Sequence, residues 1–243
     1  MITALIPARF ASTRFPAKLT KELCGKSVIQ RTYLSTLETG LFDQVIVVTD
    51  HEEIQKQIEE VGGQVFFSTT AHESGSDRIA EAVCDMDTDI VVNVQGDEPF
   101  QDQKSLRDLI SAFDDPTVQV ASMMFNISIE DAQNPNAVKV VIDQDSNAMY
   151  FSRSPIPYIR EKSEGFQYWK HVGIYAYKKH ALLQFTSWSK SKLEQIEMLE
   201  QLRLLEHGVK IKMVPTTHQA IAIDIPEDLE KAISYFQTHF PNL

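Results

Sequence analysis

The chain has 243 residues, of which 43% are hydrophobic, and its 23 basic and 34 acidic residues give a net charge of −11. This length and composition predict one large globular domain, and the acidic balance argues against nucleic acid or a membrane surface as partners. Cys24 and Cys84 are far apart and form no CxxC pair, which is typical of reduced cytoplasmic thiols. No run approaches the roughly 18 apolar residues of a membrane span, and the N-terminal run is too short for a secretion signal. We therefore expect a soluble cytoplasmic protein.

Strands and helices alternate through the first hundred residues. Hydrophobic runs predict strands at 3–6, 44–50, 64–67 and 89–95, and helical patterns lie at 27–40, 50–62 and 76–83. Asp50 and Glu53 fit a capping box for the second of these helices. Because the strands are continuously apolar, they indicate a parallel sheet covered by helices on both faces. Ligands of such sheets bind beyond the carboxyl ends of the strands, where the polar segments 7–18, 68–78 and 95–99 fall.

The second half of the chain has a different pattern. It predicts strands at 137–143, 148–152 and 171–177 without helices between them, and the prolines in 153–160 indicate an extended loop. Ser191 and Glu194 fit a capping box before one long helix at 193–208. A strand at about 209–214 and a helix at 226–240 complete the pattern. We infer one α/β domain over residues 1–243, with a mixed, mostly parallel sheet and a small inserted β-rich lobe around 125–180.

The loop after the first strand carries positive charge in an acidic chain. Small or turn-forming residues there let backbone N–H groups approach a ligand, and Arg9, Arg14 and Lys18 add cations, which together favour a phosphate site. The alternative is an ordinary exposed loop whose arginines pair with carboxylates. The neighbouring "CGKS" is no P-loop, because Thr20 stands where that motif needs glycine. No G-x-G-x-x-G follows the first strand, which argues against a dinucleotide site.

Two aspartates follow apolar strands and could hold a metal ion. Asp97 comes directly after Gly96 in "NVQGDEP", and Asp224 precedes a proline-initiated helix in "IAIDIPEDL". A carboxylate facing a polyphosphate at 4 Å would be repelled by about 4 kcal/mol at an effective dielectric near 20, and an intervening Mg²⁺ would remove that repulsion. The alternatives are that Asp97 and Glu98 cap the next helix and that Asp224 is an N-cap.

The segment "HESGSDRI" (72–79) lies at another strand-to-helix crossing. Its small residues Ser74 and Gly75 would let a planar base lie against the backbone, with Arg78 close by. The alternative is a plain helix N-cap at Ser74 or Ser76.

Eight blocks of the sequence, taken in order, resemble the CMP-Kdo synthetases, the 3-deoxy-manno-octulosonate cytidylyltransferases. The blocks are "IPARFASTRFPAK", "ESGSDRIAEAV", "NVQGDEP", "NPNAVKVV", "YFSRSPIPY", "HVGIYAY", "LEQIEMLEQLR" and "DIPEDLE". The resemblance covers nearly the whole chain. It implies a nucleotide-sugar-transferase, Rossmann-like α/β fold in a homodimer. It also implies that CTP and Kdo react to give CMP-Kdo and pyrophosphate for lipopolysaccharide biosynthesis in the cytoplasm.

The resemblance also assigns roles to matching residues. The implied CTP-binding residues are Arg9, Ser12, Arg14, Lys18, Ser74, Gly75, Arg78 and Gln95. Asp97 and Asp224 would hold Mg²⁺, and these two acids with Arg14 and Lys18 would form the catalytic set. The implied sugar-binding residues are Gln95, Arg153, His171, Tyr175, Glu200 and Gln201.

The sugar-binding residues also make chemical sense for Kdo, which carries a carboxylate and several hydroxyls. Arg153 suits the carboxylate as a bidentate partner. His171 and Tyr175 are four residues apart on one strand, so their side chains share a face. Glu200 and Gln201 could bond the distal hydroxyls. Alternatively, the last two form a solvated helix face and His171 is structural.

The sequence departs from the family pattern at two places. Ala17 stands where the family usually has glycine, and "HQAIAID" (218–224) lacks the glycine-containing stretch common before the second aspartate. Alternatives to Kdo as the substrate are a related acidic sugar, such as 8-amino-Kdo or a sialic acid. A non-catalytic nucleotide-sugar-binding regulator is a further alternative.

Overall fold

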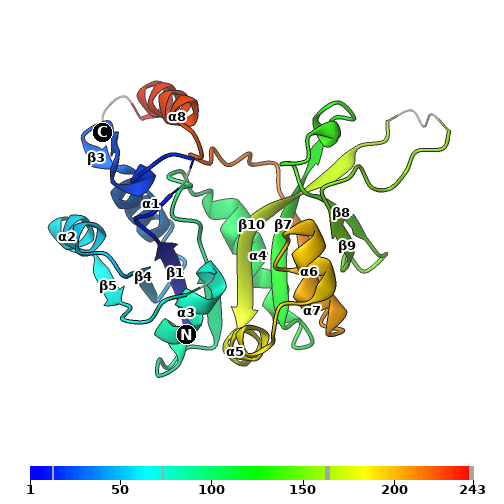
Figure 1. Cartoon of the computed structure of the whole chain (residues 1–243), viewed down its shortest axis with the longest axis horizontal. Helices are drawn as coiled ribbons and strands as arrows, with labels where there is room; N and C mark the ends of the chain where they lie inside the picture. Colours follow the sequence, from blue (N-terminus) through cyan, green and yellow to red (C-terminus); the bar gives the residue numbers. More distant parts are fainter. Residues whose placement is uncertain (13, 73, 162–164, 241–243) are drawn as a thin grey trace. The chain divides into compact units, whose positions relative to one another are not determined.

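The computed structural model describes residues 1–12, 14–72, 74–161 and 165–240, and its chain divides into two compact units (Figure 1). The first unit comprises Met1–Gln103 and Ala220–Leu243, and the second comprises Lys104–Gln219. The β-rich segment 125–180 falls inside the second unit. Whether the chain acts as a single domain stays a prediction. Among the described residues, no helix is long and apolar enough to cross a membrane.

The first unit is built on four parallel strands in the order β6-β1-β4-β5, as the apolar runs predicted. These strands are β1 (Ile2–Ala8), β4 (Gln44–Thr49), β5 (Gln64–Phe67) and β6 (Ile90–Asn93). Consecutive residues of β1 from Thr3 to Ile6 are fully buried. Because successive side chains of a strand point to opposite faces, both faces of the sheet are covered at β1.

Helices follow these strands in the predicted order. They are α1 (Val28–Glu38), α2 (Glu52–Glu60) and α3 (Gly75–Val83), and α8 (Pro226–His239) returns to the unit at the end of the chain. A short hairpin of β2 (Glu22–Leu23) and β3 (Lys26–Ser27) precedes α1, after the 3-10 turn η1 (Lys18–Thr20). At the start of α1, the Ser27 and Gln30 side chains accept each other's backbone N–H groups. This reciprocal cap fixes the first turn of the helix.

The predicted capping box of Asp50 and Glu53 is wrong. His51 is the N-cap residue of α2, and its Nδ1 accepts a hydrogen bond from the Glu53 N–H at 3.2 Å. Asp50 instead binds the guanidinium of Arg78 at 2.7 Å. The local pattern favoured a cap, but a charged partner brought close by the fold binds the carboxylate.

The second unit has a mixed sheet around β7 (Val120–Ile127). Strand β11 (Ile211–Pro215) pairs with β7 in parallel, and β10 (Tyr168–Lys178) pairs with it antiparallel. The strands predicted at 137–143 and 148–152 are confirmed as β8 (Lys139–Ile142) and β9 (Ala148–Ser152). They pair with each other antiparallel, and β8 also pairs with β10. The sequence patterns above predict neither β7 nor α4 (Gln103–Ser111). The remaining elements of the unit include η2 (Ala112–Asp114), η3 (Asp131–Gln133) and α5 (Lys179–Ser187).

The predicted single helix at 193–208 is broken into α6 (Lys192–Glu197) and α7 (Leu202–Glu206). The break lies at Met198, whose φ of 53° is left-handed. Its cause is tertiary, because Arg153 takes the carbonyls of Glu197 and Met198 as hydrogen-bond acceptors at 2.8 and 3.3 Å. The start of α6 follows the prediction, since the Glu194 carboxylate accepts the Ser191 N–H at 3.0 Å.

The left-handed turn at Met198 gives a stability prediction. A side chain in this conformation costs about 1 kcal/mol relative to glycine, and Met198 is 76% exposed, so it contributes little packing. We expect Met198→Gly to raise the free energy of unfolding by about 1 kcal/mol, or the melting temperature by about 2–4 °C. Ile196→Gly is the matched control, because Ile196 is 68% exposed within α6 and glycine there should cost about 1 kcal/mol. A loss of stability in both variants would contradict the strain at Met198.

Candidate active site

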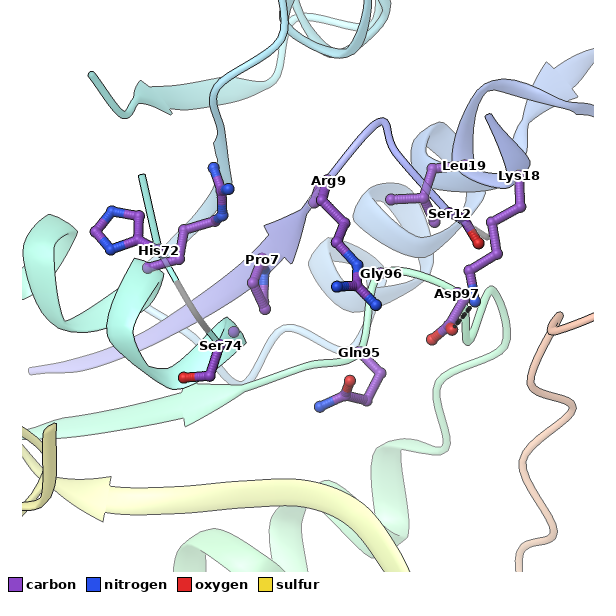
Figure 2. A pocket seen from close by; sticks show the side chains of 13 residues that line it. Pro7, Arg9, Ser12, Lys18, Leu19, His72, Ser74, Gln95, Gly96 and Asp97 are labelled. Atoms are coloured by element: carbon purple, nitrogen blue, oxygen red, sulfur yellow. Dashed lines mark hydrogen bonds and ion pairs between the residues drawn. The ribbon is translucent and has the colours of Figure 1, made fainter. Parts of the chain in front are cut away.

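A cavity of about 350 Å³ lies in the first unit beyond the carboxyl ends of β1 and β6 and beside the start of α3 (Figure 2). All the predicted CTP-binding residues except Arg14 line it, and so does Asp97. The lining residues are Pro7, Ala8, Arg9, Ser12, Lys18, Leu19, His72, Ser74, Gly75, Arg78, Gln95, Gly96 and Asp97. The structure therefore brings together residues from the three polar segments that the sequence placed at strand ends.

Two glycines let the backbone segments around the cavity approach closely. A Cβ atom at Gly96 would lie 3.1 Å from the Pro7 carbonyl oxygen, and one at Gly75 would lie 3.3 Å from the Pro7 ring. Both distances are tighter than ordinary carbon contacts, so larger residues would push the ends of β1, β6 and α3 apart. The space beside Gly75 is thus occupied by Pro7 of the protein itself.

Ser74 combines the two roles that the sequence left open. It is the N-cap of α3, since its Oγ accepts the Asp77 N–H at 3.1 Å while the Asp77 carboxylate accepts the Ser74 N–H. It also lines the cavity. The N-terminal end of α3, which carries partial positive charge, therefore lies beside the cavity, where it favours a bound anion.

The two predicted metal-binding acids meet at one lysine. The Lys18 ammonium lies 2.5 Å from Asp97 Oδ2 and 3.1 Å from Asp224 Oδ1 (Figure 2 shows the first pair). Arg14 binds the same oxygen of Asp224 at 2.9 Å. Asp97 and Asp224 are distant in sequence, and the Ile223 N–H joins their segments by a hydrogen bond of 2.9 Å to the Asp97 carbonyl. Two of the three loop cations, Arg14 and Lys18, are thus paired with carboxylates, and Arg9 and Lys18 line the cavity.

Ala17, which replaces the glycine usual in the family pattern, adopts a conformation that favours glycine. Its φ is 54° and its ψ is 32°, in the left-handed region. This conformation costs a non-glycine residue about 1 kcal/mol. The Ala17 carbonyl accepts the Thr20 hydroxyl at 2.9 Å, within the turn that presents Lys18. Ala17 thus adopts a backbone conformation that glycine would adopt without this cost.

Arg78 is held in the cavity wall by Asp50, which the sequence pattern had predicted to be a helix cap. Its guanidinium is buried, and Nη2 binds Asp50 Oδ2 at 2.7 Å. Burial alone would raise the pKa of Asp50, but the hydrogen bond and charge of Arg78 outweigh it, and the pKa is lowered. The Nη1 atom of Arg78 has no hydrogen-bond partner among the described residues. A buried N–H group without a partner favours a ligand that accepts hydrogen bonds.

His72, which lines the cavity, and Phe10, in the loop after β1, are further residues that the sequence did not single out. His72 lines the cavity, and its Nε2 lies 2.7 Å from Glu81 Oε2 and 3.0 Å from the Ser68 hydroxyl. The Phe10 ring stacks on the His51 ring at 3.8 Å, which attaches the loop after β1 to the start of α2. The position of each residue after a strand is the only sequence signal that could have indicated them.

The predicted sugar-binding residues His171 and Tyr175 lie in the second unit and share a face of β10, as predicted. Their rings are 5.3 Å apart, although a bulge interrupts the pairing between them. Burial lowers the pKa of His171 to about 3 and raises that of Tyr175 well above its usual value. Both side chains are therefore neutral at pH 7. Such groups can exchange hydrogen bonds with hydroxyls without adding charge.

The other predicted sugar-binding residues lie around the broken helix. Three of the N–H groups of the Arg153 guanidinium donate to the carbonyls of Pro135, Glu197 and Met198 at 2.8 to 3.3 Å. Gln201 is only 8% exposed and lies just before α7, so the alternative of a solvated helix face is wrong for it. Glu200 Oε1 lies 3.8 Å from the Arg203 guanidinium. The role of these residues toward a sugar stays a prediction.

The donor set at Lys18 is compatible with a magnesium ion. The described residues contain no group of three or more His, Cys, Asp or Glu side chains that could hold a metal. Mg²⁺, however, is commonly bound by one or two carboxylates together with substrate phosphates and water. Asp97, which lines the cavity, and Asp224, which binds the cavity-lining Lys18, could supply two such carboxylates.

The chain is similar to known proteins along nearly its whole length. The family model described as "Cytidylyltransferase" matches residues 3–211. A 3-deoxy-manno-octulosonate cytidylyltransferase of Flavobacterium johnsoniae is 56% identical over 235 residues, which cover 95% of this chain and 96% of that protein. A protein of the same name from Geobacter metallireducens is 42% identical over 244 residues, with 96% of each chain covered.

A solved structure of CMP:2-keto-3-deoxy-manno-octonic acid synthetase in complex with CTP is also similar. It is 36% identical, has a TM-score of 0.94, and the match covers 98% of this chain and 99% of that one. A 4-diphosphocytidyl-2C-methyl-D-erythritol synthase from Anaerococcus prevotii shares the fold, at 17% identity and a TM-score of 0.65 over 97% of this chain and 98% of that one. The predicted α/β nucleotidyltransferase fold is thereby confirmed, and the chain belongs to the cytidylyltransferase family.

Proposed function

We propose that this protein transfers CMP from CTP to the anomeric hydroxyl of 3-deoxy-D-manno-octulosonate (Kdo), giving CMP-Kdo and pyrophosphate. The identity of 56% to a relative with that name over nearly the full length supports this substrate pair. The observation that carries the proposal is the meeting of Asp97 and Asp224 at the Lys18 ammonium, beside a cavity lined by the predicted nucleotide-binding residues. This arrangement supplies both carboxylates and cations where a triphosphate would lie.

The cavity has the groups that a nucleoside triphosphate needs. Arg9, Ser12 and Lys18 would bind the phosphate oxygens as charged and neutral donors. Arg78 and Gln95 would bond to the base and ribose, and the N-terminal end of α3 adds partial positive charge. No described feature of the cavity selects cytosine over other bases, so base preference rests on the relatives.

Asp97 and Asp224 would hold Mg²⁺, our proposed cofactor, which when bound neutralises phosphate charge and makes the α-phosphorus more electrophilic. Lys18 and Arg14 would stabilise the charge that develops on the departing pyrophosphate. The anomeric hydroxyl of the sugar is the nucleophile, so no side chain needs to form a covalent intermediate. Catalysis would depend on positioning and electrostatic stabilisation by these groups.

For the sugar, we propose Arg153, His171, Tyr175, Glu200, Gln201 and Gln95 as ligands. A guanidinium has five N–H groups, and three of those of Arg153 donate to backbone carbonyls, which leaves two for a carboxylate as far as the described residues extend. The carbonyls would hold these two groups in a fixed orientation. His171 and Tyr175 are neutral and would bond sugar hydroxyls.

The proposed function also implies an assembly and a place in the cell. We propose a cytoplasmic homodimer that supplies lipopolysaccharide biosynthesis. A cytidylyltransferase for 8-amino-Kdo or a sialic acid is the alternative within the family. A non-catalytic regulator is less well supported, because both acids and the loop cations are present in one cluster.

A pyrophosphate-release assay tests the proposed function. Each of the four ribonucleoside triphosphates is combined with Kdo, 8-amino-Kdo and N-acetylneuraminic acid, with and without Mg²⁺. We expect release only with Mg²⁺, fastest for CTP with Kdo. Faster release with another acidic sugar would favour the alternative enzyme, and no release with any pair would favour the regulator.

We expect Asp97→Asn to lower the turnover number by more than about 100-fold, since even outer-shell partners of metal sites typically contribute 10- to 100-fold. The amide is a weaker ligand for a hard cation and no longer balances the Lys18 charge. Pyrophosphate release at saturating CTP, Kdo and Mg²⁺ measures the effect, with circular dichroism to check folding. Asp114→Asn, which makes the same charge change at an exposed position, is the control. A turnover number near that of the wild type would show that Asp97 is not a metal ligand.

Arg153→Ala should raise KM for Kdo by about tenfold or more, since a hydrogen bond to a charged group contributes about 1.5–3 kcal/mol. KM for CTP should change by less than about threefold, because the mutation leaves the first unit intact. Both constants are measured well below the melting temperature of the variant, because Arg153 also binds three carbonyls. Arg160→Ala, at an exposed position of the same loop, should leave both constants unchanged. Equal increases in the two constants for Arg153→Ala would contradict the sugar assignment.

A further inference from the structure

A third carboxylate, Asp228, binds the backbone that carries Asp224. Asp228 lies in the first turn of α8, and its Oδ2 accepts the N–H groups of Asp224 and Ile225, each at 3.2 Å. Its other oxygen, Oδ1, binds the Lys231 ammonium at 3.1 Å. Nothing in the site described above gives Asp228 a role.

We propose that Asp228 is the positioning residue for Asp224, and that it holds this carboxylate in place to share a divalent cation with Asp97. The proposal rests on the proposed function, because it assumes that the two acids bind the metal. It adds a residue that touches neither substrate nor metal and acts through the backbone of a ligand.

Hydrogen bonds hold the backbone on both sides of Asp224. On one side, the Ile223 N–H donates to the carbonyl of Asp97, which fixes the segment to the residue that carries the other acid. On the other side, the N–H groups of residues 224 and 225 donate to Asp228. Three consecutive backbone donors are therefore bound, and the next residue, Pro226, has none. Asp224 has little backbone freedom while these three hydrogen bonds are intact.

The sequence explains why Asp228 has this task. The N-cap residue of α8 is Ile225, whose side chain cannot accept a hydrogen bond. In a capping box, the N-cap side chain and the side chain three residues later each accept the other residue's backbone N–H. Here only the second interaction can form, in which the Asp228 carboxylate accepts the Ile225 N–H. Because Ile225 directly follows Asp224, the Asp228 carboxylate also reaches the backbone N–H of Asp224, the proposed metal ligand.

Asp228 is suited to position the site without competing for the metal. Burial would raise its pKa, but the bonds from Lys231 and from the two N–H groups outweigh burial, and the pKa is lowered. Asp228 is therefore ionised at neutral pH, and each of its oxygens already accepts a hydrogen bond. A carboxylate with both oxygens bound in this way is a poor candidate for a third ligand.

Helix α8 is anchored firmly enough to serve as a support. The Arg31 guanidinium lies 4.0 Å from the centre of the Phe236 ring, and it donates a hydrogen bond to the Leu23 carbonyl at 3.0 Å. The rings of Phe100 and Tyr235 are 4.8 Å apart. Phe100 follows Asp97 by three residues, so contacts of the helix reach back to the segment of the first acid.

The test compares Asp228→Ala with Glu227→Ala. Glu227 is the matched control, because it is an exposed carboxylate in the same helical turn for which no bond to residues 223–225 is found. Mn²⁺ serves as the probe, and its binding to each variant in the presence of CTP is measured by electron paramagnetic resonance. The Mg²⁺ concentration that gives half-maximal pyrophosphate release is measured in parallel, together with KM for Kdo and the melting temperature.

We expect Asp228→Ala to weaken Mn²⁺ binding and to raise the half-saturating Mg²⁺ concentration about tenfold, as for other outer-shell partners of metal sites. KM for Kdo should stay within about twofold, because a helix cap does not touch the sugar. Glu227→Ala should match the wild type in each metal measurement. Asp228→Glu should restore most of the binding, since glutamate at this position also completes a capping box.

A lower melting temperature with unchanged Mn²⁺ binding would overturn the proposal and leave Asp228 as a helix cap alone. If Asp228→Ala does not fold, Asp228→Asn decides the question, because the amide keeps one acceptor but loses the charge. In that variant too, unchanged Mn²⁺ binding together with a lowered melting temperature would overturn the proposal, because the weaker neutral acceptor would then have loosened the helix cap without affecting the metal. Absence of metal dependence in the wild type would instead refute the proposed cofactor, so the two failures are distinguishable.

Discussion

The structure of the site depends on the balance of charge around the Lys18 ammonium. Two carboxylates about 4 Å apart repel each other by about 4 kcal/mol at an effective dielectric near 20, so bringing Asp97 and Asp224 together requires a cation between them. Lys18 fulfils that condition with distances of 2.5 and 3.1 Å, and Arg14 adds a second cation on Asp224. Two of the three cations in the first loop of this acidic chain are thus explained by the two acids that they face.

The fold brings this cluster together through tight backbone contacts. Pro7 at the end of β1 touches the positions of Gly75 and Gly96, so three strand and helix ends converge on one cavity. Ala17 adopts a left-handed conformation that presents Lys18 to the acids. Asp224, which comes from the far end of the sequence, is held beside Asp97 by its position just before α8. Together these features fix the walls of the cavity and the positions of Lys18 and Asp224 beside it.

Much of the first unit could be predicted from its sequence, because its strands are buried on both faces and therefore read as continuous apolar runs. The position of polar residues directly after these runs was enough to find most of the cavity lining. Local patterns failed where a distant residue decides the outcome. Asp50 resembles half of a capping box but pairs with Arg78, and the helix at 193–208 is broken by hydrogen bonds from Arg153. No pattern within a few residues contains either partner.

The charge balance also bears on how nucleotide and metal would bind under the proposed function. Arg14, Lys18, Asp97 and Asp224 form a neutral group of two cations and two anions. A triphosphate alone would draw both cations toward itself and leave two adjacent carboxylates without compensation. A divalent cation alone would compete with Lys18 for the same oxygens. When both arrive together, the phosphates take the cations and the acids take the metal, so every charge keeps a partner. Under the proposed function, the site would therefore bind the nucleotide and the metal as one complex.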